Sequence, residues 1–266
     1  MFSNDRSPGK VLIFDIKGPM AHFRKYYTNS SSLSYLFPPR TVVVGLIAGL
    51  LGLPSERHTK EKESIYYERF GGEQCLVAVS LRSKIRRMIQ KLNYNFTKTE
   101  NKEISFSKHS QIPLEILFPE DDDDITYRVY FYYENEDGEW IYSELKRRLE
   151  EQMFVFPPYM GITEFLASIE YIGEGRVSKN PNQEVELNSV CRLGDVELDF
   201  SGEDLQYLIE KMPTGFLNDR TPQQTGEYVL EVKSRVVKVK LKEDTVCYTV
   251  SYPEGDRAVI ENIMFM

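Results

Sequence analysis

Cysteine is scarce in this sequence, and its few cysteines follow no recognisable spacing. The 266 residues include Cys75, Cys191 and Cys247, which are widely separated and form no CxxC pair. This pattern argues against a disulfide framework, a zinc knuckle and a thiol redox motif. We therefore expect buried or incidental thiols.

The sequence also lacks a long apolar run. The first ten residues contain no stretch of the signal-peptide type, and the longest apolar segment, residues 41–54, is too short to cross a bilayer. That segment predicts a buried helix instead. Because 41% of the residues are hydrophobic, the chain can bury a real core. We expect a globular, cytoplasmic protein without membrane contact.

Positive charge is in deficit over the whole chain, whose formal net charge is −8. Since affinity for nucleic acid comes largely from lysine and arginine, this balance argues against a nucleic-acid-binding protein. The charges are unevenly spread, however, because residues 82–98 contain no acid. The cations of this segment are Arg82, Lys84, Arg86, Arg87, Lys91 and Lys98. We expect a basic face that binds RNA and an acidic remainder that meets proteins.

Acidic residues collect at residues 120–124 and 134–139. The first of these runs lacks the spaced ligands and the glycine of a calcium loop. It predicts a solvated hairpin tip, and we expect neither a metal nor a cofactor.

Apolar patterning and turn signals predict alternating strands and helices over residues 11–172. We expect strands at residues 11–16, 74–81, 113–118, 126–133 and 165–172, a loop up to residue 35, and helices that open at residues 38–41, 61 and 139. The last helix would place Trp140, Leu145 and Leu149 on one side. The order strand, helix, strand, strand, helix, strand is typical of a ferredoxin-like or RRM-like α+β unit.

The basic segment has Ile85, Met88, Ile89 and Leu92 at helical spacing. This spacing predicts a segment of which half packs and half faces solvent. Beyond residue 173 we expect a smaller, mostly β region with strands at residues 184–190, 196–200, 228–233, 236–242 and 246–252 and one helix near residues 204–211. The sequence thus predicts two domains, residues 1–173 and residues 174–266.

Three N-terminal motifs resemble those of one known family. They are FDIKGPMAHFRK at residues 14–25, SYLFPPRT at residues 34–41 and GLIAGLLG at residues 45–52, with a weaker echo, PPYMG, at residues 157–161. In these motifs the chain is similar to the fifth Cas protein family, and it most resembles the form found in type I-B CRISPR systems.

The resemblance implies a RAMP-superfamily protein with a ferredoxin-like domain and an inserted hairpin at about residues 82–111. Such a protein sits at one end of the Cascade complex, where it holds the 5′ handle of the crRNA and contacts the backbone and large subunits. It meets target DNA only indirectly, through the complex. Because the guide reads sequence by base pairing, this subunit needs no catalytic site.

Candidate RNA-binding residues fall in three places. Arg24, Lys25, Tyr26 and Tyr27 combine cations with flat rings, which suits phosphate contact and base stacking, although a solvated loop with half-buried tyrosines has the same composition. Arg40 precedes a helix and could reach a phosphate at its N-terminus, or form an ordinary ion pair. The third place is the basic cluster of Arg82, Lys84, Arg86, Arg87 and Lys91, whose alternative role is a solvated face.

The main alternative function is that of a metal-independent endoribonuclease that cuts precursor crRNA. The resemblance to the related type I-C members of the family implies this alternative. Lys108 and His109, with a tyrosine such as Tyr26 or Tyr27, could supply the proton transfer and the cation that this cleavage needs. The type I-B character of the N-terminal motifs favours a subunit without catalytic residues, because a separate processing enzyme is expected there. A purely protein-binding scaffold is disfavoured by the concentrated basic segment.

Overall fold

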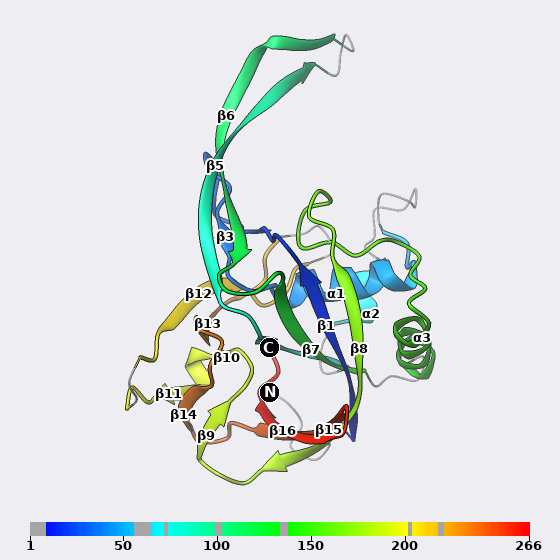
Figure 1. Cartoon of the computed structure of the whole chain (residues 1–266), viewed down its shortest axis with the longest axis vertical. Coiled ribbons are helices and arrows are strands. Elements are labelled where there is room, and N and C mark those ends of the chain that lie inside the picture. The colour runs from blue at the N-terminus through cyan, green and yellow to red at the C-terminus, as the bar shows by residue number, and fades with distance from the viewer. Residues whose placement is uncertain are drawn as a thin grey trace.

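A six-stranded antiparallel sheet organises the fold (Figure 1), with the strand order β16-β15-β8-β1-β7-β4. The computed structural model describes residues 9–55, 65–71, 74–98, 103–133, 138–201, 204–217 and 221–266. The strands of this sheet are β1 (Lys10–Gly18), β4 (Cys75–Leu81), β7 (Ile125–Tyr133), β8 (Ser168–Asn180), β15 (Cys247–Glu254) and β16 (Arg257–Ile263). The helices are α1 (Arg40–Leu51), α2 (Ile65–Arg69), α3 (Gly138–Glu151) and the short η2 (Leu193–Asp195).

The predicted α+β character is confirmed, with strands in the majority. Along the chain β1, α1, β4, β7, α3 and β8 follow one another as strand, helix, strand, strand, helix and strand, which is the order predicted from the sequence. In the sheet these strands lie in the order β8-β1-β7-β4, each antiparallel to its neighbour. The expected domain boundary at residue 173 falls inside β8, and the end of β8 pairs with β15.

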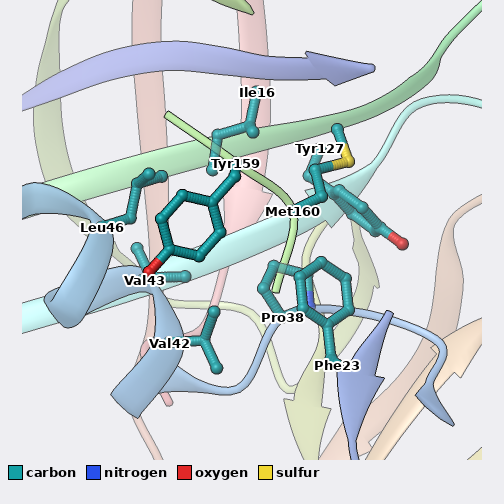
Figure 2. A pocket seen from close by; sticks show the side chains of 9 residues that line it. All are labelled: Ile16, Phe23, Pro38, Val42, Val43, Leu46, Tyr127, Tyr159 and Met160. Atoms are coloured by element: carbon teal, nitrogen blue, oxygen red, sulfur yellow. The ribbon is translucent and has the colours of Figure 1, made fainter. Parts of the chain in front are cut away.

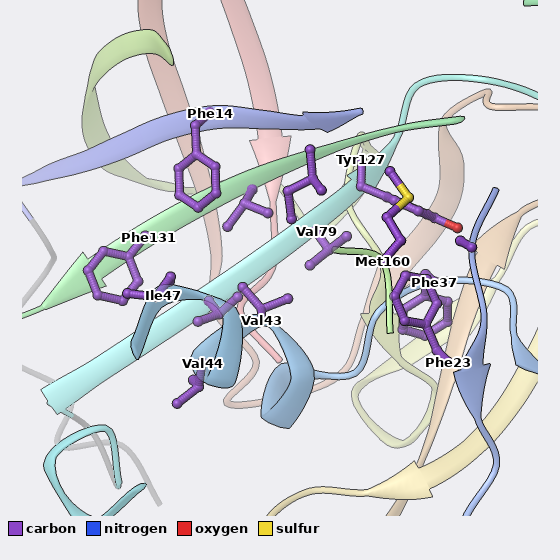
Figure 3. Close-up of a cluster of buried hydrophobic side chains, with 14 of the residues drawn as sticks. Phe14, Phe23, Phe37, Val43, Val44, Ile47, Val79, Tyr127, Phe131 and Met160 are labelled. Carbon is purple, nitrogen blue, oxygen red and sulfur yellow. The ribbon is translucent and has the colours of Figure 1, made fainter. Parts of the chain in front are cut away.

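The main core lies between this sheet and helices α1 and α3. Leu12, Phe14 and Ile16 alternate along β1 and all point to the helix side, where they are buried. Their cross-strand partners on β7, Phe131, Val129 and Tyr127, belong to the same core. Figure 3 shows Phe14 and Phe131 on the side of the sheet where Val43, Val44 and Ile47 of α1 pack. A sheet face and two helices therefore form one packed layer pair.

Local signals explain both long helices. Helix α1 starts directly after Pro38 and Pro39, and it ends at Gly52, which takes the left-handed conformation at φ 75°. Helix α3 buries Ile141, Leu145 and Leu149, which are four residues apart. The prediction that Trp140 packs with them was wrong, since Trp140 lies one position off this stripe and is 50% exposed. Among the described residues, no helix is long and apolar enough to span a membrane.

The opposite face of the sheet is covered by its own C-terminal strands. Val11 and Ile13 of β1 pack there against Val250 and Ile263 from β15 and β16. The backbone amide of Met266 then donates to the carbonyl oxygen of Val77 at 2.9 Å, so the chain end reaches the far edge strand β4. The sheet therefore curls until its two edges come together, and edge strand β16 was not predicted from the sequence.

Two small sheets follow β8 in the chain. One has the order β10-β13-β12, with β10 (Cys191–Arg192), β13 (Thr225–Glu231) and β12 (Tyr207–Pro213), and the other has the order β11-β14-β9, with β11 (Val196–Leu198), β14 (Val237–Leu241) and β9 (Glu184–Leu187). The helix predicted near residues 204–211 was wrong. Exposed Ile209 and Lys211 alternate with buried Glu210 and Met212, which is the period of a strand. Pairing with β13 supplies the backbone partners of this strand.

A long hairpin, β5 (Ile85–Lys98) with β6 (Glu103–Pro119), extends away from the body of the protein (Figure 1). The helical spacing proposed for the basic segment was therefore wrong. Met88 and Ile89 are adjacent, so they point to opposite faces of the ribbon, and both are exposed. Residues 120–124 form the turn between β6 and β7 and are largely exposed, which confirms the predicted solvation. The predicted hairpin there was wrong, because β6 pairs with β5 while β7 pairs with β1 and β4.

Candidate nucleic-acid interface

A charged cluster lies at the base of the hairpin and joins distant parts of the chain. We define the charged cluster as Lys25, Arg87, Glu115 and Glu210. Lys25 Nζ lies 2.5 Å from Glu210 Oε2, a contact between residues 185 positions apart in the sequence. Arg87 reaches Glu115 Oε1 at 3.8 Å and Glu210 Oε1 at 3.9 Å. The loop after β1, both hairpin strands and β12 thus meet at one point.

Backbone pairing holds the hairpin against the loop that follows β1. Ala21 and Leu117 exchange two backbone hydrogen bonds of 3.1 and 2.9 Å, and the amide of Glu115 donates to the carbonyl oxygen of Ser32 at 2.9 Å. The Glu115 side chain accepts a 2.8 Å hydrogen bond from the Ser34 amide through Oε2. Short strands β2 (Phe23–Arg24) and β3 (Ser34–Tyr35) close the same loop. One carboxylate therefore serves both the loop and Arg87.

His22 fixes this junction from inside. Its Nδ1 lies 2.7 Å from the Glu115 carbonyl oxygen and its Nε2 lies 2.8 Å from the Ser32 hydroxyl oxygen. Because a carbonyl oxygen only accepts, Nδ1 carries the proton and Nε2 accepts from the hydroxyl. Burial lowers the pKa of His22, which keeps the ring neutral near neutral pH. This histidine is a structural link between loop and hairpin.

Two tyrosine rings stand exposed beside the charged cluster. Tyr26 and Tyr27, which we call the tyrosine pair, are 43% and 52% exposed, and their rings meet edge to face at 5.2 Å between centroids. Thr28 closes the loop behind them by donating its hydroxyl to the Lys25 carbonyl oxygen at 2.9 Å. Arg24 is exposed and donates to the Thr28 carbonyl oxygen at 3.0 Å. The loop is thus held in place while both rings remain about half exposed, which suits base stacking.

Lys25 was predicted as a cation of an open loop, and the structure buries it. Its ammonium is held by Glu210 and lies 5.5 Å from the centre of the Tyr35 ring. The positive charge of Lys25 is therefore used inside the protein, next to the tyrosine pair.

The predicted cations of the hairpin are divided between its faces. Arg86 is exposed and lies 5.6 Å from the centre of the ring of Phe118, its cross-strand partner. The next residue, Arg87, belongs to the charged cluster. Lys91 is exposed further out along β5. Lys84, just before the hairpin, pairs with Asp121 at 2.5 Å. Arg86 and Lys91 are thus exposed hairpin cations that lie outside the charged cluster.

Two other predicted cations serve the fold. Arg40 donates to the carbonyl oxygens of Phe70 and Cys75 at 2.7 and 2.8 Å, so its guanidinium joins α1 to the start of β4. Arg82 donates to the Tyr130 hydroxyl at 2.8 Å and pairs with Glu261 at 2.5 Å. Neither guanidinium lies with the tyrosine pair or the charged cluster.

The curled sheet contains a second set of buried charges. Arg128 makes two hydrogen bonds to the Asp15 carboxylate, of 2.7 and 2.9 Å, and a third to Glu254 at 2.6 Å. Its cross-strand partner is Asp15 itself, so register alone brings this pair together. Fully bonded buried pairs of this kind fix one arrangement of the sheet. We assign these residues to folding.

Two residues named for the alternative function lie in the hairpin. Lys108 and His109 belong to β6, and their side chains lie outside the described residues. Among the described residues, no group of three or more His, Cys, Asp or Glu could hold a metal ion.

An apolar depression lies between α1 and residues 159–160 (Figure 2). Val42, Val43 and Leu46 of α1 face Tyr159 and Met160 across it. The lining offers apolar side chains and no charged group, so it shows how residues 159–160 pack against the helix. It does not show a catalytic constellation.

Glu115, Glu210 and His22 were not predicted as site residues from the sequence. The available signal was a single acid in an otherwise apolar segment, as for Glu115 among residues 112–118. A charged residue in such a segment is buried only with a partner. Those partners come from other segments, which the sequence alone does not identify.

An α+β fold with a protruding basic hairpin beside exposed aromatic rings defines a candidate nucleic-acid-binding protein. A family model described as CRISPR-associated protein (Cas_Cas5) matches residues 11–240. Since this match covers most of the chain, the protein belongs to the Cas5 family of CRISPR-associated proteins, as the N-terminal motifs predicted. No curated protein sequence matches the chain.

Several solved structures are similar to this chain. A crystal structure of a CRISPR protein from Archaeoglobus fulgidus has a TM-score of 0.50 at 13% identity, covering 95% of this chain and 99% of that chain. A chain of a CRISPR RNA-guided surveillance complex has a TM-score of 0.43 at 11% identity, covering 86% and 91%. A chain of the Type III-B Cmr-beta complex bound to cognate target RNA and AMPPnP has a TM-score of 0.43 at 10% identity, covering 86% of both chains. The first of these likenesses supports the fold.

Proposed function

We propose that this protein is a non-catalytic RNA-binding subunit of a type I CRISPR effector complex of the Cascade kind, and that it caps the 5′ handle of the crRNA. Membership of the Cas5 family supports a place in such a complex. The N-terminal motifs support the type I-B form. In this proposal the protein works in the cytoplasm, contacts the backbone and large subunits, and meets target DNA only through the complex.

One observation carries the proposal: the tyrosine pair and the basic hairpin are joined at the charged cluster. Single-stranded RNA is bound by rings that stack on bases and by cations that neutralise the backbone. Tyr26 and Tyr27 supply exposed rings, while Arg86 and Lys91 supply exposed cations on the hairpin. The net charge of −8 does not oppose this, because binding depends on the local field.

The sheet topology supports a ferredoxin-like, RAMP-type domain within this proposal. Strands β8, β1, β7 and β4 lie side by side in that order, all antiparallel, and α1 and α3 connect β1 to β4 and β7 to β8. The hairpin is inserted between β4 and β7, where an arm can reach along a bound RNA. The fold thus provides a rigid platform with one projecting element.

A salt series with matched charge variants tests the proposal. The double variant Arg86→Glu/Lys91→Glu reverses exposed hairpin cations, whereas Arg192→Glu/Lys240→Glu makes the same charge change on the small sheets, where both cations are also exposed. Affinity for RNA of the host repeat sequence is measured from low to physiological salt. For single strands the slope of log K against log salt is about −0.7 per phosphate contact. The hairpin variant is expected to flatten it by about 1.4.

The control variant is expected to keep the slope of the wild-type protein. Equal losses in both double variants would show that only total charge matters. An unchanged slope in the hairpin variant would show that the RNA does not contact the hairpin cations, and it would overturn the proposal.

A further inference from the structure

The Arg87 guanidinium is held between carboxylates but is not saturated by them. Its distances of 3.8 Å to Glu115 and 3.9 Å to Glu210 exceed hydrogen-bond length. An arginine has five N–H donors, and this side chain is 37% exposed. The ion pairs therefore orient the charge and leave N–H donors for another partner.

Glu210 is buried in an arrangement that costs stability. Its side chain is 2% exposed, and among the described residues its Oε1 has no hydrogen-bond partner. Leaving a buried oxygen without a donor costs about 1–3 kcal/mol. Oε2 is fixed by Lys25, so Oε1 cannot turn toward solvent without breaking that buried pair. Buried polar atoms left in this state require an explanation beyond packing.

The position of the unpaired oxygen suggests that explanation. Glu210 Oε1 faces Arg87, Glu210 Oε2 holds Lys25, and Lys25 is adjacent in sequence to the tyrosine pair. Glu115 contacts Arg87 and is itself fixed by the Ser34 amide. The guanidinium is thus held by carboxylates that also bind the loop carrying the tyrosine pair.

We propose that Glu210 is a positioning residue for RNA, which together with Glu115 orients Arg87 for a directional contact to one phosphate. The guanidinium fork matches a phosphate in geometry, and fixing it in advance lowers the entropy cost of binding. This inference rests on the proposed function and names one contact within it. It also gives β12, from the C-terminal part of the chain, an indirect role in RNA binding, through Arg87.

The sign of one mutational effect separates positioning from simple charge. Glu210→Gln removes a negative charge near the RNA, so electrostatics alone predicts tighter binding and a steeper salt slope. Positioning predicts weaker binding, because Arg87 loses one of the groups that orient it. We expect Arg87→Met to weaken binding to repeat RNA about tenfold, as for loss of one directional contact, and to flatten the slope by about 0.7.

A double-mutant cycle then tests whether Glu210 acts through Arg87. Glu210→Gln is expected to weaken binding severalfold in the wild-type background and to have no further effect in the Arg87→Met background. Arg87→Lys keeps the charge without the fork, and we expect it to restore the slope but not the affinity. Unchanged or tighter binding by Glu210→Gln overturns the proposal, and so does an equal loss in both backgrounds.

Folding effects are separated by matched variants. Glu231→Gln neutralises another carboxylate of the same small sheet, one that is equally buried and accepts from the backbone amides of Gln206, Lys233 and Arg235. It is expected to lower the unfolding temperature without changing RNA affinity. If Glu210→Gln does not fold, Lys25→Met/Glu210→Gln removes both buried charges and is expected to show the same loss. If the RNA affinity of the wild-type protein did not depend on salt, the proposed function itself would be refuted.

Discussion

Gly161 offers the sharpest test of how the loop after β1 is held in place. Its φ is +89°, and a Cβ built there would lie 1.9 Å from the carbonyl oxygen of His22. The neighbouring residue Met160 accepts a 3.0 Å hydrogen bond from the His22 amide. Any side chain at position 161 must therefore push the backbone of His22 away. We expect Gly161→Ala to break this contact.

The cost of Gly161→Ala follows from two contributions. Left-handed backbone costs an alanine about 1–2 kcal/mol, and loss of the backbone hydrogen bond adds about 0.5–1.5 kcal/mol. A total of about 1.5–3.5 kcal/mol lowers the midpoint of thermal unfolding by about 3–14 °C for a chain of this size. Differential scanning calorimetry measures it. The control is Gly194→Ala, where a Cβ meets open space at an ordinary φ. Equal midpoints in the two variants would refute the reasoning.

Two further predictions concern acid stability and catalysis. Burial by itself raises the pKa of Glu261, but the charge of Arg82 and hydrogen bonds from Arg82, Tyr130 and Tyr252 bring it below its ordinary value of 4.5. The stability that this gives is complete above pH 4.5 and is lost as pH falls through the lowered pKa. In denaturant titrations the stability advantage of wild type over Glu261→Gln should therefore shrink on the acid side of 4.5; an advantage that grows there would contradict this. For catalysis, we expect both wild type and His109→Ala to leave repeat RNA intact in EDTA. If the protein were a nuclease, wild type would cut the RNA, and His109→Ala would lower the cleavage rate by roughly 10²–10⁴-fold.

Local patterns in the sequence were sufficient for much of the central sheet. The β-branched run at the start of β1, the prolines before α1 and the glycine after it each act within a few residues, so the elements follow from short segments. The family motifs also lie there, which explains why the family could be predicted. Local spacing failed in the basic segment, because the apolar residues of a two-faced ribbon can match helical spacing.

The candidate site was predicted only in its exposed parts. Tyr26, Tyr27 and Arg86 are exposed, as their predicted contact with RNA requires. Lys25 and Glu210 are separated by 185 positions, and their pairing depends on how β12 packs against the loop. The pattern of residues adjacent in the sequence does not predict such a long-range contact. Buried charges with partners from another segment are therefore the features that sequence reasoning misses.

We propose that the tyrosine pair and the hairpin hold the 5′ end of the guide RNA. Photocrosslinking of the guide RNA in the assembled complex, followed by mass spectrometry and sequencing, tests it most directly. We predict crosslinks at Tyr26 or Tyr27 and at residues 86–91 of β5, joined to nucleotides at the 5′ end. Crosslinks confined to α3 or the small sheets, or to the 3′ end of the RNA, would contradict this account.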